Sequence, residues 1–307
     1  MKTKVDIFKN AVHLTAIALC MTIFASFKNS PASSDTSNII MTVNPNNNKV
    51  VFAMAGSGKI TIDWGDGKVR TRKLRIYNDD GLWFFKDKYQ YRFAHSYSGS
   101  STHTIKIIGN NITHLSTCKL TNNLRKTNNL TNLDVSGATE LKWLDCRNNQ
   151  LTELDVSANI FLEGLNCFIN RLTSLKLSIS LTYLECSYNK LTSLDLNNIT
   201  ELIYLWCNEN KLTSLELSNN IALVSLWCSI NQLTKLELSN NTELKLIVCR
   251  RNNLSTDALN ALFGTLHNNM SSDKNIHISY NPGANDCDKS IAKEKGWTVT
   301  SGFIIIN

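Results

Sequence analysis

The chain has 307 residues, of which 42% are hydrophobic, so it is long enough to bury a core and to form two modest domains. Its three prolines exclude long proline-rich linkers. The formal net charge of +7 is mild for this length and does not by itself indicate nucleic acid as a partner, so none is expected.

The N-terminus has the composition of a secretory signal. Three lysines lie within the first nine residues, and an apolar run follows over 11–25 that is too short for a membrane span. We predict a signal peptide over 1–25, with residue 32 as the alternative cleavage point, followed by a polar linker over 33–39. The mature protein is then secreted or held at a bacterial cell surface, with no transmembrane span.

A lipid anchor is a second possibility at this end of the chain. It would use Cys20, but Leu19 stands where a lipoprotein signal carries a small residue. We therefore prefer a cleaved signal peptide without a lipid.

Residues 40–112 alternate apolar and polar residues between turn signals, which predicts a small all-β domain. The segment "ITIDWGDGK" at 60–68 resembles the D-W-G-D-G signature of PKD-like β-sandwich domains. The later "HSYSGSSTHTIKIIG" at 95–109 resembles the end of the same family. This resemblance implies a surface-protein module without catalytic activity.

The predicted β domain is basic. Its "KVRTRKLR" segment places Lys68, Arg70 and Arg72 at alternate positions, hence on one face of a strand. A solvated strand is the simpler interpretation, and a surface for an anionic glycan or a cell envelope is the alternative.

A repeat begins further along the chain. Its first leucines are separated by 21, 19, 21, 21 and 21 residues, at Leu141, Leu162, Leu181, Leu202, Leu223 and Leu244. Each starts a segment of the form L-x-x-L-x-C-x-x-N-x-L, with Ile247 replacing the second leucine in the last. A fixed period of this length predicts a solenoid of about six to seven coils, with two extended edges per coil.

The segment matches the leucine-rich-repeat signature, with cysteine at the third apolar position. Over 113–254 the chain resembles the short-repeat class of secreted bacterial leucine-rich-repeat proteins, broadly internalin-like. The resemblance implies a mainly β fold. Residues 255–307 then predict an α/β cap, which an open solenoid end requires.

Two columns of identical side chains follow from the repeat. The cysteines occupy an apolar position and should lie in the core as small hydrophobic residues, because one cysteine per coil forms a line and not a convergent metal site. The asparagines should bond backbone groups of adjacent coils. The predicted cysteine ladder is Cys146, Cys167, Cys186, Cys207, Cys228 and Cys249, and the asparagine ladder is Asn149, Asn170, Asn189, Asn210, Asn231 and Asn252.

The residues beside each cysteine should point the opposite way, onto the predicted concave face. Several are aromatic, which predicts binding anchors at Trp143, Phe168, Tyr183, Tyr204, Trp206 and Trp227. Exposed aromatic patches mark interaction surfaces, but cross-strand stacking that only stabilises the sheet explains them equally well.

The opposite edge carries a second column, and its charge is mainly acidic. Its members are Asp134, Asp155, Lys176, Asp195, Glu216 and Glu237. A solvated face is the preferred interpretation, and a calcium or basic-partner site is the weaker one because the neighbouring serines are poor ligands.

No motif for catalysis, phosphate binding, metal binding or a cofactor occurs in the chain. We therefore predict a non-catalytic binding protein, expected to engage a protein or glycan in adhesion to a host or matrix. The alternatives are an accessory to a carbohydrate-active enzyme and a structural envelope protein.

Overall fold

A computed structural model of the chain describes residues 38–44, 49–76, 92–99, 101–118, 128–269 and 273–302. The chain divides into two units, 1–36 and 37–307, and every described residue belongs to the second. The predicted signal peptide and Cys20 lie outside the described residues. Within these ranges no helix is both long and apolar enough to cross a membrane.

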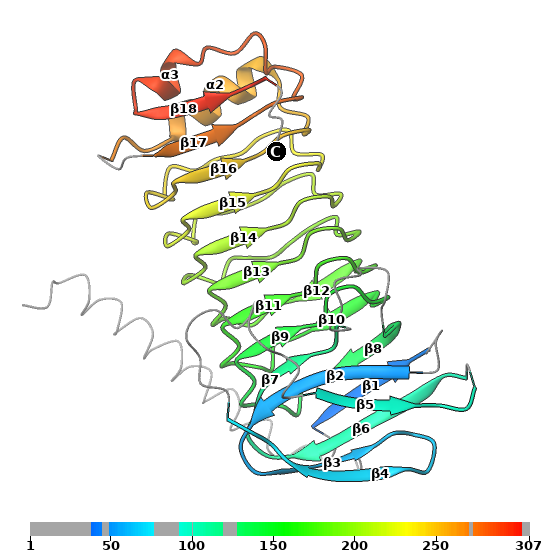
Figure 1. The fold of residues 1–307 in the computed structure, drawn as a ribbon. Helices are drawn as coiled ribbons and strands as arrows, with labels where there is room; N and C mark the ends of the chain where they lie inside the picture. Colours follow the sequence, from blue (N-terminus) through cyan, green and yellow to red (C-terminus); the bar gives the residue numbers. More distant parts are fainter. Residues whose placement is uncertain are drawn as a thin grey trace, which may run out of the picture. The chain divides into compact units, whose positions relative to one another are not determined.

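The first seven strands form parts of two sheets (Figure 1). Their bounds are β1 (Ile39–Val43), β2 (Lys49–Gly56), β3 (Lys59–Asp63), β4 (Val69–Lys73), β5 (Arg92–Ser96), β6 (His103–Gly109) and β7 (Ile112–Ser116). Buried and less buried residues alternate along β1 and β3, as expected where one face of a strand meets the core. Strand β1 begins at Ile39, inside the segment predicted as a linker.

The repeats form a leucine-rich-repeat solenoid of about seven turns, which confirms the predicted fold class. Each coil adds one short parallel strand to a single sheet. These strands are β9 (Trp143–Asp145), β11 (Gly164–Asn166), β13 (Tyr183–Glu185), β14 (Tyr204–Trp206), β15 (Ser225–Trp227) and β16 (Leu246–Val248). They pair in register, so equivalent residues of successive coils lie side by side.

The second edge of the solenoid is regular only in its early coils. Strand β8 (Leu130–Asp134) pairs with β1, and β10 (Glu153–Asp155) pairs in parallel with β12 (Ser174–Lys176). In the described coils after β12 this edge has no hydrogen-bonded strand, so the pairing of β10 with β12 does not continue there. In those coils, asparagine side chains bond to the carbonyls of the preceding coil at this edge.

Both N-terminal sheets continue into the solenoid. Strand β7 pairs antiparallel with β2 and parallel with β9, while β1 pairs antiparallel with β6 and β8. An eleven-stranded sheet therefore runs from β5 through the repeats to β18. Strand β7 itself spans the boundary that the sequence placed between residues 112 and 113. The domain boundaries drawn from the sequence stay predictions.

The buried asparagines hold the coils together. Asn210 donates from Nδ2 to the carbonyls of Cys186 (3.1 Å) and Cys207 (3.2 Å), and its Oδ1 accepts from the backbone NH of Leu191 at 3.0 Å. The same pattern recurs at Asn170 and Asn231. Each amide thus satisfies backbone groups of two coils that the short strands leave unpaired.

Sequence analysis missed two extensions of this scheme. Asn281 of the cap continues the ladder, donating to the carbonyls of Cys249 and Ile278 at 2.9 and 2.8 Å. A second buried column lies at the other edge, where Asn159, Asn220 and Asn241 donate to carbonyls of the preceding coil. The asparagine of the "SAN" and "SNN" segments was the available signal.

The residue before each ladder asparagine has a left-handed backbone. The seven φ angles lie between 50° and 63°, at Asn148, Ile169, Tyr188, Glu209, Ile230, Arg251 and Tyr280. Glycine and asparagine tolerate this conformation, but a β-branched side chain does not. The stack of coils therefore imposes strain at Ile169 and Ile230.

The cap contains α2 (Thr256–Thr265), β17 (Lys274–His277), α3 (Ser290–Lys293) and β18 (Trp297–Thr300). Ser255 accepts the Ala258 NH and so begins α2. The helix predicted over "NDCDKSIAKEKG" is shorter than expected. The Asp288 carboxylate bonds the Ser290 NH at 3.0 Å, and residues before it form turns.

We predict that Asn210→Ala will lower the free energy of unfolding by about 2–4 kcal/mol, because three buried backbone groups lose their partner. Urea denaturation monitored by circular dichroism measures this. Asn219→Ala is the control, since Asn219 makes one exposed bond, to the Asn197 carbonyl. Equal losses in the two variants would contradict the structural role of the ladder.

We also predict that Ile230→Asn will raise the free energy of unfolding by about 1 kcal/mol, because asparagine tolerates φ of 54° better than isoleucine. Ile221→Asn is the matched control: both isoleucines are exposed, at 37% and 53%, but only Ile230 has a positive φ. The melting temperature of Ile230→Asn should rise above that of the wild type, and that of Ile221→Asn should not. An equal change in both variants would show that backbone strain is not the cause.

Candidate binding surface

Strand register brings the predicted anchors together on one face of the eleven-stranded sheet. Tyr183 pairs with Tyr204, and Trp206 pairs with Trp227. The ring of Trp206 lies 5.6 Å from that of Tyr183 and 6.0 Å from that of Trp227, between ring centroids. With Trp143, these four residues form what we call the aromatic strip.

A glycine lets Trp143 join this strip. Trp143 and Tyr183 lie on strands β9 and β13, which flank β11, yet their ring centroids are 5.7 Å apart. Gly164 of β11 pairs with both residues, and a Cβ atom at Gly164 would overlap the Trp143 ring. The missing side chain therefore leaves the space through which the two rings meet.

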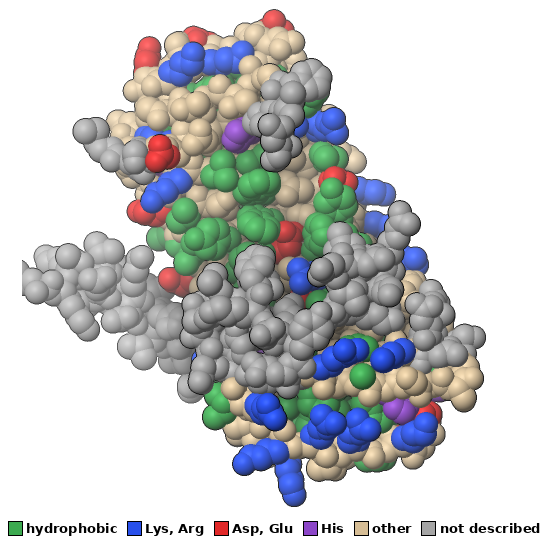
Figure 2. Space-filling model, viewed as in Figure 1, with side chains coloured by type: hydrophobic (Ala, Val, Ile, Leu, Met, Phe, Trp, Pro, Cys, Tyr) green, Lys and Arg blue, Asp and Glu red, His purple; other side chains and the backbone are tan. Residues whose placement is uncertain are grey.

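The rings of the strip pack against one another as well as facing outward. Tyr204 is 43% exposed, whereas Trp143, Tyr183, Trp206 and Trp227 are half-buried. Figure 2 shows hydrophobic side chains gathered over β13, β14 and β15. The strip therefore combines cross-strand ring packing with an exposed apolar surface, the two features that the sequence analysis set against each other.

Phe168 does not join the strip. Its ring meets that of Tyr188 edge to face, with centroids 5.1 Å apart, in the turn beyond the strand. Phe168 follows Cys167, after the last residue of β11, so its side chain belongs to the edge of the sheet and not to its face.

Polar side chains also lie on or beside this face, at β9 and β13. Asp145 is fully buried and pairs with Arg147, whose Nε lies 3.3 Å from Oδ1. Glu185 is 7% exposed, and its Oε1 accepts the Ser187 NH at 2.8 Å. Burial raises the pKa of the Glu185 carboxyl, and the bond from Ser187 only partly opposes this.

Cations lie toward the cap end, in the turn after β16. The guanidinium carbons of Arg250 and Arg251 are 5.8 and 4.9 Å from the centroid of the Tyr280 ring. Burial, and then the charge of Arg250, lower the pKa of His277. Arg251 and Tyr280 were missed by sequence analysis, and the signal was their place before the ladder asparagine.

The cysteine ladder lies wholly in the core. All six thiols are fully buried, and the eight cysteines among the described residues are free. Burial raises the pKa of the Cys249 thiol to about 12 and that of the other five well above the ordinary value of 9. Such thiols are poor nucleophiles. Within the described ranges no group of three or more His, Cys, Asp and Glu side chains is placed to hold a metal.

The column on the other edge acts mainly within its own turns. Asp134, Asp155 and Asp195 each accept the backbone NH two residues later. Lys176 lies 3.0 Å from Asp155, an exposed ion pair between neighbouring coils. A shallow groove of about 410 Å³ runs between this pair and β8, and its charged residues Asp134, Asp155 and Lys176 are engaged by these contacts.

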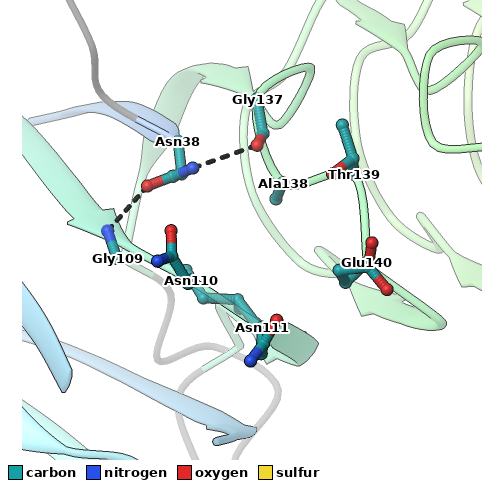
Figure 3. Close-up of a pocket in the computed structure, with 9 residues that line it drawn as sticks. Asn38, Gly109, Asn110, Asn111, Gly137, Ala138, Thr139 and Glu140 are labelled. Carbon is teal, nitrogen blue, oxygen red and sulfur yellow. Dashed lines mark hydrogen bonds between the residues drawn. The ribbon is translucent and has the colours of Figure 1, made fainter. Parts of the chain in front are cut away.

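A smaller pocket of about 170 Å³ lies where the first coil meets the N-terminal sheet (Figure 3). Asn38 donates to the Gly137 carbonyl at 3.1 Å and accepts the Gly109 NH at 2.6 Å across it. Ligand pockets are commonly 300–1,000 Å³ in volume and mostly apolar. This one is small and polar, so we interpret it as a joint between the two sheets.

No protein-family model matches the chain, and no curated protein matches it. Among solved structures, the functional domain of InlJ from Listeria monocytogenes, which includes a cysteine ladder, is 33% identical over 56% of this chain, with a TM-score of 0.48. An internalin (inlF) from the same organism is 22% identical over 55% of the chain, with a TM-score of 0.37. A Shigella effector LRR domain is 22% identical over 61%, with a TM-score of 0.43.

The matches cover 36%, 42% and 80% of these three structures, respectively. This chain therefore spans less than half the length of the two Listeria structures.

We predict that Glu185→Gln will raise the melting temperature at neutral pH. Because its pKa is raised in the folded state, ionised Glu185 destabilises the fold, and this penalty grows as pH rises above the ordinary value of 4.5. Glutamine keeps the acceptor for Ser187 without the charge. The difference between variant and wild type should vanish as pH falls toward 4.5.

Glu163→Gln is the control for this pH series. The Glu163 side chain is 58% exposed and lies 3.8 Å from Lys142. Removal of its charge should therefore leave the dependence of melting temperature on pH almost unchanged. A Glu185→Gln profile parallel to that of the wild type would contradict the burial effect.

Proposed function

We propose that this chain is a non-catalytic binding protein that engages a protein ligand through the aromatic strip. The observation that carries the proposal is the run of rings from Trp143 to Trp227, with centroids 5.6–6.0 Å apart along it. Repeat solenoids present rigid extended surfaces of this kind. Because the rings support one another, little side-chain freedom is lost when a ligand binds.

Ring geometry favours a protein ligand over a glycan. Trp206 and Trp227 are inclined to each other by 53°, and Tyr183 meets Trp206 at 69°. Neighbouring rings therefore share no flat plane on which consecutive sugars could stack. Tilted rings instead form a corrugated apolar surface into which protein side chains fit.

Polar groups at both ends of the strip suit the rim of such an interface. Arg147 lies just after β9 at one end, and Arg250 and Arg251 lie just after β16 at the other. Rim charges steer association and set specificity, while the central aromatics contribute most of the affinity. We place the protein outside the cell on the basis of the signal peptide expected over 1–25, with adhesion as its role.

The double variant Trp206→Ala/Trp227→Ala should weaken ligand binding at least a hundredfold, since each central aromatic of an interface contributes about 2 kcal/mol or more. The measurement starts from a screen of the mature chain against arrayed extracellular proteins and glycans. Affinities of the hits are then measured for the variant. Tyr204→Ser, at the most exposed ring, should reduce affinity with little loss of stability.

Phe161→Ala/Ile221→Ala is the matched control, because both side chains are exposed and apolar but lie outside the strip. The tryptophan variant should melt lower than wild type, so binding is compared at a temperature where all variants are folded. Hits that bind the tryptophan variant and wild type equally would refute the proposal. Hits confined to glycans would refute the choice of a protein ligand.

A further inference from the structure

Positive charge is concentrated at one border of the N-terminal sheets. Residues 49–76 carry seven Lys and Arg against two Asp, a net +5 in a chain whose total is +7. Strand β4 lies at the edge of its sheet, and all five of its residues are exposed. We call this cluster the basic edge: Lys59, Lys68, Arg70, Arg72, Lys73 and Arg75. Figure 2 shows Lys and Arg side chains gathered over the N-terminal strands.

Strand register sets cations on both faces of β4. Lys73 lies directly opposite Lys59 of β3, on the outer face of the sheet. Arg70 and Arg72 lie opposite the buried Ile62 and Ile60, so they point to the other face. Residues two apart on a strand are separated by about 6.8 Å, which gives a regular row of charges.

Carboxylates of the described residues neutralise few of these charges. Within the described residues, Lys68 is the only member of the basic edge with a carboxylate within 4 Å, Asp66 at 3.6 Å. That carboxylate is already bonded to His95 at 2.8 Å. Arg72 instead lies over the Phe93 ring, 5.9 Å from its centroid. Like charges directly opposite each other destabilise a sheet, so the pairing of Lys59 with Lys73 lowers the stability of this sheet. No contact among the described residues offsets this repulsion.

Protection of the sheet edge explains only part of this pattern. Charged side chains on an edge strand prevent it from pairing with another chain, which accounts for Arg70 and Arg72. Lys59, however, lies on β3, which is flanked by β4 and β6 and is not an edge. Its positive charge is therefore unnecessary for edge protection.

We propose that the basic edge binds an anionic polysaccharide, independently of the aromatic strip. Cations on both faces of one strand suit a thin polymer that lies along the edge, whereas a flat membrane would meet one face. The large apolar side chains exposed nearby, Val69, Ile76 and Ile108, are aliphatic. Proteins that bind single-stranded nucleic acid stack its bases on exposed aromatic rings, and this surface offers none among the described residues.

The test uses heparin as the probe, with the full mature chain. Affinity is measured by fluorescence titration between 50 and 300 mM salt. Wild type should bind with log K falling linearly with log salt concentration, as charge-driven binding to a polyanion does. The variant Lys59→Gln/Arg70→Gln/Arg72→Gln/Lys73→Gln should bind at least tenfold more weakly at 100 mM salt and show a shallower slope.

Lys190→Gln/Lys211→Gln is the charge control, because it removes two exposed lysines of the solenoid. Arg70→Gln/Arg72→Gln removes the same number of charges at the basic edge. The heparin affinity of the control should stay within twofold of that of the wild type, and the affinity of the basic-edge variant should fall further. Trp206→Ala/Trp227→Ala should bind heparin normally, which separates this site from the proposed function. Circular dichroism confirms that each variant is folded.

Three results would overturn the proposal. The first is equal weakening by the two double glutamine variants, which would indicate net charge alone. The second is binding of single-stranded DNA, or of vesicles containing anionic lipid, tighter than that of heparin. The third is no heparin binding at 50 mM salt, in which case the cations serve only to protect the edge and the quadruple variant should aggregate.

Discussion

The hydrogen bonds from buried asparagine amides to cysteine carbonyls are the interaction on which the rest of the structure depends. A strand of three residues makes too few backbone bonds to hold a coil, and the turn that follows it would bury unpaired carbonyls and NH groups. One amide at each turn satisfies three of them. This requirement recurs in every coil, so the asparagine must recur at the same place. The left-handed residue before it completes the turn, even where isoleucine occupies that position at a conformational cost.

The same geometry decides which side chains are available for function. With the asparagine fixed at the turn, the leucine and cysteine before it point into the core, and the residues between them must point outward. Successive coils then place outward residues side by side at the spacing of a parallel sheet. A tryptophan beside a cysteine thus becomes one member of a continuous surface. The cysteine itself is fully buried, and its raised pKa fits a packing role.

The period, the inward columns and the fold class were predictable because each follows from one repeated segment. Details that depend on contacts between different coils were not. Gly164 was visible as an outward residue, but its effect on Trp143 arises only when β9, β11 and β13 lie together. Phe168 shared the aromatic character of the strip, yet its position after the strand sends it to Tyr188. The continuity of both sheets across residue 112 was equally hidden, because it depends on β7 pairing with β9 and on β1 pairing with β8, about 90 residues away.

Under the proposed function, the stabilising and binding roles of the aromatic strip do not exclude each other, because its rings are both exposed and packed together. A ring held by its neighbours has lost its freedom before any ligand arrives, so the entropic penalty belongs to folding and not to association. Tyr204 keeps the largest exposed fraction of the strip while its neighbours support it. Cross-strand stacking alone requires aromatic residues at only one position of each successive strand. This chain instead staggers them, with tyrosine at the start of β13, tyrosine and tryptophan on β14 and tryptophan at the end of β15, so the apolar surface runs diagonally across the coils.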